Sequence, residues 1–296
     1  MNKHAYLIIA HHQFDLLEKI IRLLDDERND FYIHIDKKVA NFDYDKFKSI
    51  PQFSKIEFVP AVSVTWGGYS QIQSEINLLK SAISGNYDYY HLISGADMPI
   101  KTKDEIYNFF QNHNGKEFIH FSPQEFAESD NVRYRVNLYH LFQEKIGGKK
   151  NILFVIQKIL IKLQKLFRIS RLKKLDYPIY CGANWFSITH NTASFLLSKE
   201  NEAKKALSHS FCADELFLQT YFMQSPYKDN LFDASGLDCK ANMRYVDWAR
   251  GNGRGNPYVF TTEDFVTLMS TDALFARKFD LNKDPAICNM IYDKLK

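Results

Sequence analysis

Hydrophobic and polar residues follow one another along the first half of the chain in a pattern of alternating strands and helices. Short apolar runs are typical of strands buried on both faces, and apolar residues three or four positions apart predict helices. The runs predict strands over 6–10, 31–35, 55–59, 89–93 and 118–121, and helices over 14–24, 70–83 and 103–110. This alternation indicates an α/β fold with a mostly parallel central sheet flanked by helices.

The second half of the chain is more mixed. Its patterns predict strands over 184–188 and 243–248 and helices over 191–199 and 214–222, followed by a glycine-rich stretch, GNGRGNP. No linker rich in Pro, Gly or Ser and no internal repeat divides the sequence. A single domain over residues 1–296, with an insertion at about 145–175, is therefore the simplest interpretation.

The insertion stands out by its charge. Residues 145–174 include ten basic residues and no acidic one, whereas the whole chain has a net charge of +3, so the remainder carries −7. Lys158, Lys162 and Lys165 fall on one side of a helix, and apolar residues over 156–167 fall largely on the other. One interpretation is contact with an anionic membrane; the other is a surface helix packed on the core by its apolar face. Nucleic acid binding is not expected, because no recognition or base-stacking motif accompanies the charge.

Composition excludes several classes of protein. With 45% hydrophobic, 15% aromatic and 25% charged residues, the 296-residue chain is typical of a folded globular protein. Its four cysteines form no CxxC pair, so we expect reduced thiols rather than a zinc site or a disulfide framework. The apolar run over 5–10 is too short for a signal sequence or a membrane span, and no longer run occurs.

Asp36 is the first candidate for a binding residue, because it directly follows the apolar strand over 31–35. Ligands of open parallel sheets bind at the carboxyl ends of the strands, where a carboxylate can accept hydrogen bonds from ribose hydroxyls. A helix cap or a solvated strand end is the alternative. The sequence has no GxxxxGK[ST] loop and no GxGxxG after its first strand, which disfavours P-loop chemistry and a nucleotide-binding oxidoreductase.

A DxD motif, which commonly holds a divalent cation against a diphosphate, occurs at Asp43-Tyr44-Asp45. It lies in a polar loop rather than after an apolar strand, so we expect no metal there. Without a metal, cationic side chains must neutralise a diphosphate leaving group. Such cations are available late in the chain at Arg250, Arg254, Arg277 and Lys278.

A pair of carboxylates, Asp214 and Glu215, opens the predicted helix over 214–222. Anions are favoured at this end of a helix by its dipole, so simple helix charge is one interpretation. The other is catalytic, because a base that deprotonates a sugar hydroxyl needs a positioned carboxylate.

Eight segments together resemble glycosyltransferase family 14, which contains the core-2/I-branching β-1,6-N-acetylglucosaminyltransferases and the peptide O-xylosyltransferases. They occur in the family order and cover nearly the whole chain: AYLIIAHH (5–12), FYIHIDKK (31–38), VTWGGYSQIQSEINLLK (64–80), YYHLISGADMPIKT (89–102), GANWFSIT (182–189), ADELFLQT (213–220), YVDW (245–248) and LFARKFD (274–280). The resemblance implies a GT-A-like fold, inversion at the anomeric carbon and no metal.

The resemblance also implies roles for single residues. Glu215 matches the catalytic base, Lys278 the lysine that contacts the donor diphosphate, and Asp36 a donor-site acid. Trp248 matches an acceptor-site tryptophan, and Asp214 is assigned to the acceptor site with it.

One family position departs from this sequence. The second diphosphate-binding residue of the branching enzymes, an arginine, aligns with Gly255. We expect its neighbour Arg254, or else Arg250, to supply the missing charge.

The implied reaction moves a sugar, with N-acetylglucosamine as first candidate, from a UDP-sugar to a hydroxyl of a glycan or lipid-linked saccharide, without a cofactor. Animal members of the family carry an N-terminal membrane anchor and disulfides, and this sequence shows neither. We therefore expect a bacterial, cytoplasmic member that is peripheral on the inner face of the membrane. The alternative is a non-catalytic carbohydrate- or nucleotide-binding protein that retains the fold.

Overall fold

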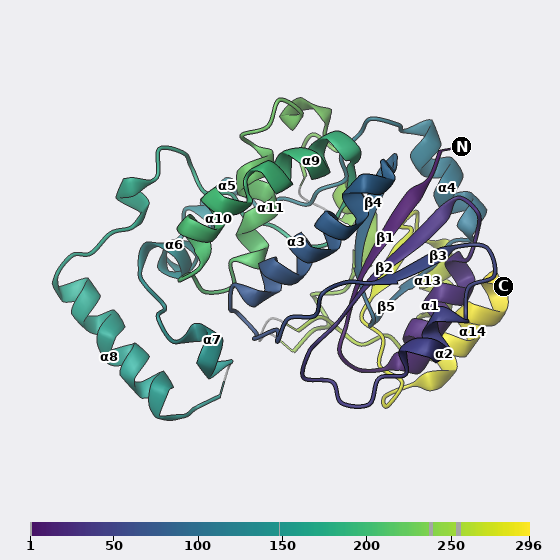
Figure 1. Cartoon of the computed structure of the whole chain (residues 1–296), viewed down its shortest axis with the longest axis horizontal. Helices are drawn as coiled ribbons and strands as arrows, with labels where there is room; N and C mark the ends of the chain where they lie inside the picture. The colour runs from purple at the N-terminus through teal and green to yellow at the C-terminus, as the bar shows by residue number, and fades with distance from the viewer. Residues whose placement is uncertain (1, 148, 237–238, 253–255) are drawn as a thin grey trace.

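The computed structural model describes residues 2–147, 149–236, 239–252 and 256–296 (Figure 1). The strands are β1 (His4–Ala10), β2 (Asn29–Ile35), β3 (Lys55–Phe58), β4 (Tyr89–Ser94), β5 (Asp97–Pro99), β6 (Ser187–Thr189), β7 (Arg244–Val246) and β8 (Phe275–Arg277). The α-helices are α1 (Phe14–Leu24), α2 (Tyr44–Lys48), α3 (Ser70–Ala82), α4 (Lys103–Asn112), α5 (Gln124–Ala127), α6 (Asp130–Asn137), α7 (Gln143–Ile146), α8 (Ile152–Leu166), α9 (His190–Ser198), α10 (Glu200–Leu207), α11 (Asp214–Phe222), α12 (Cys239–Asn242), α13 (Phe265–Ser270) and α14 (Pro285–Leu295). Short 3-10 helices are η1 (Ile83–Gly85), η2 (Leu172–Lys174), η3 (Lys228–Asn230) and η4 (Thr262–Asp264).

The larger sheet has the strand order β3-β2-β1-β4-β6. Strands β1 to β4 run parallel, with Ile8 of β1 paired with Ile33 of β2 and with Ile93 of β4, whereas β6 runs antiparallel to β4. A smaller sheet has the order β5-β8-β7. This arrangement, with helices on both faces of the larger sheet (Figure 1), confirms the predicted α/β class with a mostly parallel central sheet.

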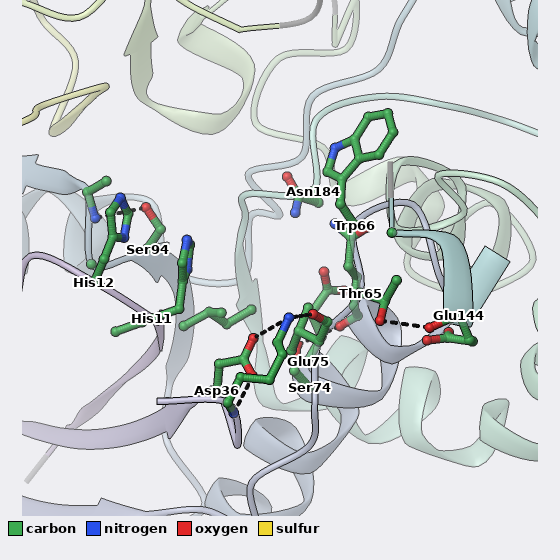
Figure 2. A pocket seen from close by; sticks show the side chains of 18 of the residues that line it. His11, His12, Asp36, Thr65, Trp66, Ser74, Glu75, Ser94, Glu144 and Asn184 are labelled. Atoms are coloured by element: carbon green, nitrogen blue, oxygen red, sulfur yellow. Dashed lines mark hydrogen bonds and ion pairs between the residues drawn. The ribbon is translucent and has the colours of Figure 1, made fainter. Parts of the chain in front are cut away.

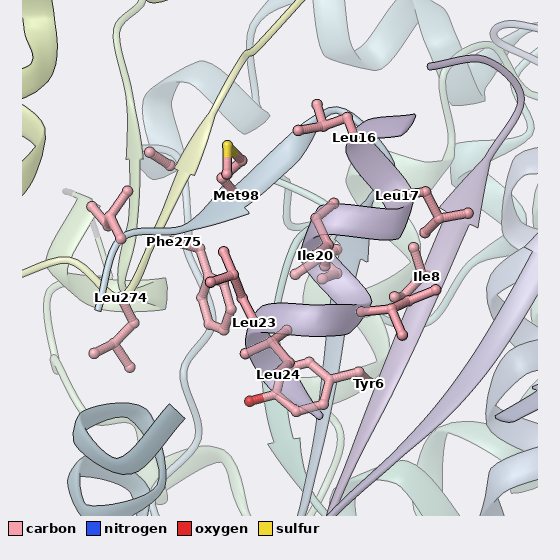
Figure 3. Close-up of a cluster of buried hydrophobic side chains, with 14 of the residues drawn as sticks. Tyr6, Ile8, Leu16, Leu17, Ile20, Leu23, Leu24, Met98, Leu274 and Phe275 are labelled. Atoms are coloured by element: carbon pink, nitrogen blue, oxygen red, sulfur yellow. The ribbon is translucent and has the colours of Figure 1, made fainter. Parts of the chain in front are cut away.

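Strand β1 separates two hydrophobic cores because successive side chains of a strand point to opposite faces. Tyr6 and Ile8 belong to the core that includes α1 and α14, whereas Ala5 and Leu7 belong to the core that includes α3, α9 and α11. Figure 3 shows Ile8 of β1 beside Ile20 of α1, and Tyr6 of β1 beside Leu24 of α1. Each Leu or Ile that becomes fully buried in such a core contributes about 2 kcal/mol.

A buried arginine joins the two sheets. Arg244 of β7 donates hydrogen bonds from Nη2 to the carbonyl oxygens of Leu92 (3.3 Å) and Phe186 (2.5 Å) and to Ser187 Oγ (3.0 Å). Burial lowers the pKa of Arg244 to about 9. These bonds fix β7 against β4 and β6, and β8 pairs with β7, so the end of β8 is held near the end of β4.

The predicted strand over 118–121 is wrong. Only isolated bridges form there, from Glu117 to Leu231 and from Phe118 to Ser187. The following amides bond to separate loops instead of to one strand, since Phe121 N donates to Gly236 O at 2.6 Å and Ser122 N to Cys181 O at 2.8 Å.

Three of the four cysteines, Cys181, Cys212 and Cys288, are free and buried. The reduced state of the thiols stays a prediction.

Candidate functional site

A cavity of about 520 Å³ lies where three parallel strands of the larger sheet end, the place where open α/β sheets bind ligands. His11 and His12 follow β1, Asp36 follows β2, and Ser94 ends β4. Figure 2 shows the two histidines and Ser94 on one side of the cavity and Trp66 and Glu144 on the other. The remaining lining residues are Ile9, Ala10, Lys38, Val64, Thr65, Gln71, Ser74, Glu75, Gly95, Ala96, Lys145, Ile146, Gly147, Lys149, Asn184, Trp185, Arg277 and Lys278.

Asp36 is held at the wall of this cavity by the turn that follows β2. Its Oδ1 accepts a hydrogen bond from Lys38 N at 2.9 Å, and its Oδ2 lies 3.4 Å from Lys38 Nζ. The carboxylate is buried to 7% exposure, yet it lines the cavity. The structure thus places Asp36 where the strand-end argument expects it, and contact with a donor ribose stays a prediction.

The end of β8 supplies a cationic wall. Arg277 Nη1 donates to Asp97 Oδ1 (2.7 Å) and to Ser94 Oγ, and its Cζ lies 4.6 Å from the centre of the Trp185 ring. No carboxylate in the described residues lies within ion-pair distance of the neighbouring Lys278. Burial lowers the pKa of Lys278, and the charge of Arg277 lowers it further. Asp280 and Asp97 offset these effects only in part. An anionic ligand beside the Lys278 ammonium would therefore stabilise its charged form.

Two histidines stand beside this wall. The rings of His11 and His12 are stacked, with centroids 4.2 Å apart and an interplanar angle of 19°. Burial is the main cause that lowers the pKa of both rings, and Lys278 lowers the pKa of His12 further. Both shifts favour the neutral form of the rings, which present flat surfaces to the cavity.

A buried carboxyl pair, Glu75 and Asp214, lies at the opposite side of the cavity, which Glu75 lines and Asp214 does not. Glu75 lines the cavity at 1% exposure, and the neighbouring side chain of Asn184 partly stabilises its charged form, although neither carboxyl oxygen makes a hydrogen bond of normal geometry within the described residues. Asp214 Oδ2 accepts from Gln71 Nε2 at 2.8 Å, whereas its Oδ1 has no partner in the same part of the chain. Burial raises the pKa of Glu75 well above its ordinary value, with a further contribution from Asp214. Burial and the charge of Glu215 raise the pKa of Asp214 to about 7.

Glu215 lies behind this wall and does not line the cavity. Its side chain is 48% exposed and forms an ion pair with Arg135 Nη1. Its backbone carbonyl accepts a hydrogen bond from Gly182 N at 2.9 Å. The helix start therefore places Glu215 next to Asp214 with its carboxylate paired to an arginine, and its role as catalytic base stays a prediction.

The loop after β7 carries the other predicted residues. Trp248 is 60% exposed and does not line the cavity. The loop returns beside the cationic wall, since Tyr258 N donates to Asp247 O (2.8 Å) and Lys278 N donates to Tyr258 O (3.4 Å). Trp248 therefore presents an open ring near this edge of the site, and its acceptor role stays a prediction.

Arg250 is engaged elsewhere. It forms ion pairs with Asp247 (2.6 Å) and Asp264 (2.8 Å), and its guanidinium lies 4.0 Å from the centre of the Tyr258 ring. The structure does not bring it to the cavity. Arg254 and Gly255 lie outside the described residues.

The DxD motif serves a local purpose. Asp43 caps α2, because its side chain accepts a hydrogen bond from Lys46 N at 2.9 Å. Asp45 is 97% exposed and lies 3.8 Å from Lys48. Within the described ranges, no group of three or more His, Cys, Asp or Glu side chains is arranged to hold a metal ion.

Sequence reasoning missed Glu75, Asn184 and Arg135 as site residues. Glu75 lies within the amphipathic helix α3, where a carboxylate is typical of a solvated face, and Arg135 lies far from Glu215 in sequence. Glu75 and Asn184 could have been found only from the two segments that resemble the glycosyltransferase family, 64–80 and 182–189, because these contain them.

The fold and the position of this cavity are those of an α/β protein whose ligand binds at strand ends, and the chain is similar to glycosyltransferases along nearly its whole length. It belongs to the Core-2/I-branching enzyme family, whose model matches residues 4–270. This result confirms the resemblance drawn from the eight segments.

Similar proteins include two human enzymes. The β-1,3-galactosyl-O-glycosyl-glycoprotein β-1,6-N-acetylglucosaminyltransferase is 24% identical, with 95% of this chain and 66% of that protein covered. The N-acetyllactosaminide β-1,6-N-acetylglucosaminyl-transferase is 25% identical, with 95% and 69% covered. Rat xylosyltransferase 2 is 23% identical over 93% of this chain, which spans 32% of that protein's length.

A crystal structure of mouse xyloside xylosyltransferase 1 in its apo form also matches. The match covers 93% of this chain and 97% of that one, with a TM-score of 0.40 and 11% identity, a similarity too low to support an inference.

Proposed function

We propose that the protein is an inverting, metal-independent glycosyltransferase. It moves a sugar, with N-acetylglucosamine as first candidate, from a UDP-sugar to a hydroxyl of a glycan or lipid-linked saccharide. Its matched relatives are named as β-1,6-N-acetylglucosaminyltransferases and xylosyltransferases, so xylose is the second donor sugar to test.

The observation that carries this proposal is the arrangement of charges around one strand-end cavity. Lys278, Lys145 and Lys149 line the cavity without a carboxylate at ion-pair distance among the described residues, and Arg277 and Lys38 line it while paired with Asp97 and Asp36. A diphosphate needs such counter-charges as its bond to the sugar breaks. Asp36 and the two histidines offer hydrogen-bonding and flat surfaces to the nucleoside.

In the proposed mechanism, Glu215 removes the proton from an acceptor hydroxyl. The oxygen attacks the anomeric carbon, the bond to the diphosphate breaks, and UDP leaves with its charge stabilised by Lys278. A single displacement inverts the anomeric centre. Arg135 keeps the Glu215 carboxylate in one orientation, and the exposed ring of Trp248 offers an apolar face to the acceptor sugar.

Glu75 and Asn184 are two of the polar groups that this cavity offers to a sugar ring, because both line it. The carboxyl of Glu75 is buried, and its interaction with Asn184 leaves lone pairs free for further hydrogen bonds. A buried polar group whose hydrogen bonds are not made costs about 1–3 kcal/mol. A sugar hydroxyl that bonds to Glu75 would offset part of that cost, which favours hydroxylated ligands over apolar ones at this wall.

We place the enzyme in the cytoplasm at the inner face of the membrane, where a lipid-linked saccharide is presented. The basic insertion at 145–174 supports this placement, because two of its lysines, Lys145 and Lys149, also line the cavity.

The test is a panel of UDP-sugars incubated with purified protein in excess EDTA, with UDP release as the readout and the Glu215→Gln variant as control. We expect one sugar, N-acetylglucosamine first, to be hydrolysed faster than the others, and the variant to be inactive. Transfer to simple saccharide acceptors, followed by determination of the anomeric configuration, tests inversion. The proposal is wrong if no UDP-sugar is turned over while the protein is folded.

One observation favours the alternative of a non-catalytic carbohydrate- or nucleotide-binding protein. Glu215 is ion-paired with Arg135 and lies outside the cavity lining. Saturable UDP binding by calorimetry, without hydrolysis of any UDP-sugar in the panel, would establish that alternative.

A further inference from the structure

Helix α8 is fastened to the rest of the protein by polar side chains. Gln164 Oε1 accepts a hydrogen bond from Tyr139 N (2.7 Å), and its Nε2 donates to Tyr139 O (3.0 Å). About two turns earlier in the helix, Gln157 Oε1 accepts a hydrogen bond from Phe142 N (2.9 Å), and its Nε2 donates to Gln143 Oε1 (3.3 Å). Both glutamines are buried, together with Ile161 between them. The attached face of α8 therefore combines these polar contacts with buried Ile161 and with half-buried Leu153, Phe154 and Leu160.

The opposite face of α8 is apolar and exposed. Residues at spacings of three and four lie on the same side of a helix, and those of α8 form a stripe turned away from the buried glutamines. Ile152, Leu166 and Phe167 are 71%, 73% and 72% exposed. The other members are Val155, Ile156, Ile159 and Leu163. The interpretation of α8 as a surface helix packed on the core by its apolar face is thus wrong, because this face contacts no core.

Figure 1 shows α8 projecting from the body at the side away from α1 and α14. Neither α8 nor any other helix within the described ranges is long and apolar enough to cross a membrane. A short helix with an exposed apolar stripe can instead lie in the plane of a membrane interface.

Exposed basic residues lie along one flank of this stripe and in the segments that precede and follow α8. Of the ten in 145–174, nine are exposed. The exception is Arg171, which is buried and donates to the backbone carbonyls of Leu138 (3.1 Å) and His209 (3.0 Å). Lys158, Lys162 and Lys165 lie along one flank of the apolar stripe, so the same surface offers apolar contact and positive charge.

We infer that α8, with the basic residues on both sides of it, docks on an anionic lipid bilayer. The apolar stripe enters the boundary between headgroups and acyl chains, and the lysines on its flank reach lipid phosphates. A second copy of α8 fits this surface less well, because pairing would bring like charges together without an acidic partner in the segment. Nucleic acid would match the lysines but leave the apolar stripe in water.

Docking would also orient the cavity. Lys145 and Lys149, which line it, lie at the approach to α8, so a bilayer bound along α8 lies near that wall of the site. A saccharide attached to a lipid could then reach the site without leaving the membrane. This orientation rests on the proposed function, whereas docking itself does not.

The experiment is flotation of the full chain with vesicles of phosphatidylcholine alone and of phosphatidylcholine mixed with phosphatidylglycerol. We expect binding to the anionic vesicles at low salt, weaker binding at high salt, and little binding to neutral vesicles. The triple variant Lys158→Glu, Lys162→Glu, Lys165→Glu should lower the partition coefficient by on the order of 100-fold, because each basic residue near an anionic surface contributes appreciably.

Two further variants separate charge from apolar contact. A matched triple variant at exposed lysines outside the segment, Lys116→Glu, Lys204→Glu, Lys294→Glu, changes the net charge equally and should lower binding far less. Ile159→Ser with Leu163→Ser keeps every lysine and should weaken binding at high salt, where the apolar contribution dominates. Circular dichroism checks that each variant is folded.

Three results would overturn the inference. The first is no flotation of folded wild-type protein with anionic vesicles at low salt. The second is an equal loss of binding in the two lysine triple variants, because binding would then depend only on net charge. The third is a dimer in light scattering that Leu163→Ser dissociates, without vesicle binding, which would assign the stripe to a second copy. UDP-sugar hydrolysis by the Lys158→Glu, Lys162→Glu, Lys165→Glu variant should stay unchanged. A protein that fails to hydrolyse UDP-sugars would contradict the proposed function, whereas a protein that fails to bind vesicles would contradict membrane docking.

Discussion

Replacement of Asp214 by asparagine should change how the stability of the protein depends on pH. Asp214 is 6% exposed, and burial together with the charge of Glu215 raises its pKa from 3.8 to about 7. The folded state therefore holds this proton more tightly than the unfolded chain. Below the pKa of the unfolded state, such a carboxyl group does not lower the free energy of unfolding. As pH rises, the loss of stability grows, and it is complete above the pKa of the folded state.

The size of the effect follows from that interval. From 3.8 to about 7 is roughly 3 pH units, and each unit corresponds to about 1.4 kcal/mol, so the full cost is about 4 kcal/mol. Asparagine carries no proton to lose. Its amide keeps an acceptor for Gln71 Nε2 but places a donor where the Asp214 Oδ1 has no described partner, at a cost of about 1–3 kcal/mol that does not depend on pH. The change with pH in the difference in unfolding free energy between variant and wild type therefore tests the reasoning, whereas the constant part of that difference does not.

The assay is urea unfolding of wild type and Asp214→Asn from about pH 4 to about pH 8 at constant ionic strength. The free energy of unfolding of the variant, minus that of wild type, should rise by about 4 kcal/mol in favour of the variant across this range. Buried histidines such as His91, whose pKa is lowered by burial, contribute equally to both proteins. Their contribution therefore cancels when the two unfolding free energies are subtracted. Asp45→Asn, at a 97% exposed position, is the matched control and should give a nearly flat difference. Parallel curves for Asp214→Asn and wild type would refute the reasoning, because the carboxyl would then ionise as readily in the folded protein as in the unfolded chain.

Three predictions concern the reaction. Glu215→Gln should lower kcat roughly 100-fold or more while UDP affinity by calorimetry stays nearly constant, and turnover close to wild type would remove Glu215 from the role of base. Lys278→Ala should weaken UDP binding and slow transfer. Arg250→Ala should weaken UDP binding less, because Arg250 is paired with Asp247 and Asp264. A larger loss of UDP affinity in Arg250→Ala than in Lys278→Ala would show that Arg250 contributes to the diphosphate site. Activity should persist in excess EDTA, and complete loss that manganese restores would contradict the metal-independent mechanism.

The strand and helix pattern of the first half could be predicted because long amphipathic elements carry strong periodicity. The bounds of α1 agree with the predicted helix over 14–24. In the second half, the bounds of α11 also agree with the predicted helix over 214–222, although this helix is buried on almost every side. Strands β5 and β8 were not predicted, since each has three residues and lacks the longer apolar run that surrounds the equally short β6 and β7. Their pairing depends on contacts between residues that are distant in sequence.

The site could be predicted in part for a similar reason. Asp36 was found from its position after a strand, which is local information. The proximity of Arg135 to Glu215, and the burial of Glu75 beside Asp214, arise only when distant helices pack together. The outward turn of the α8 stripe was not predictable either, because an amphipathic pattern does not state which face packs on the protein.

The attachment of α8 through Gln157 and Gln164 has an evolutionary consequence. Both glutamines bond mainly to backbone groups of 139–143, which any residues at those positions would provide, except for the one contact with Gln143 Oε1. The exposed stripe, in contrast, has no complementary surface within the protein to which it must be fitted. The two glutamines should therefore persist among close relatives while the residues of the stripe diverge freely in size, as selection adjusts one side of the helix without disturbing the other.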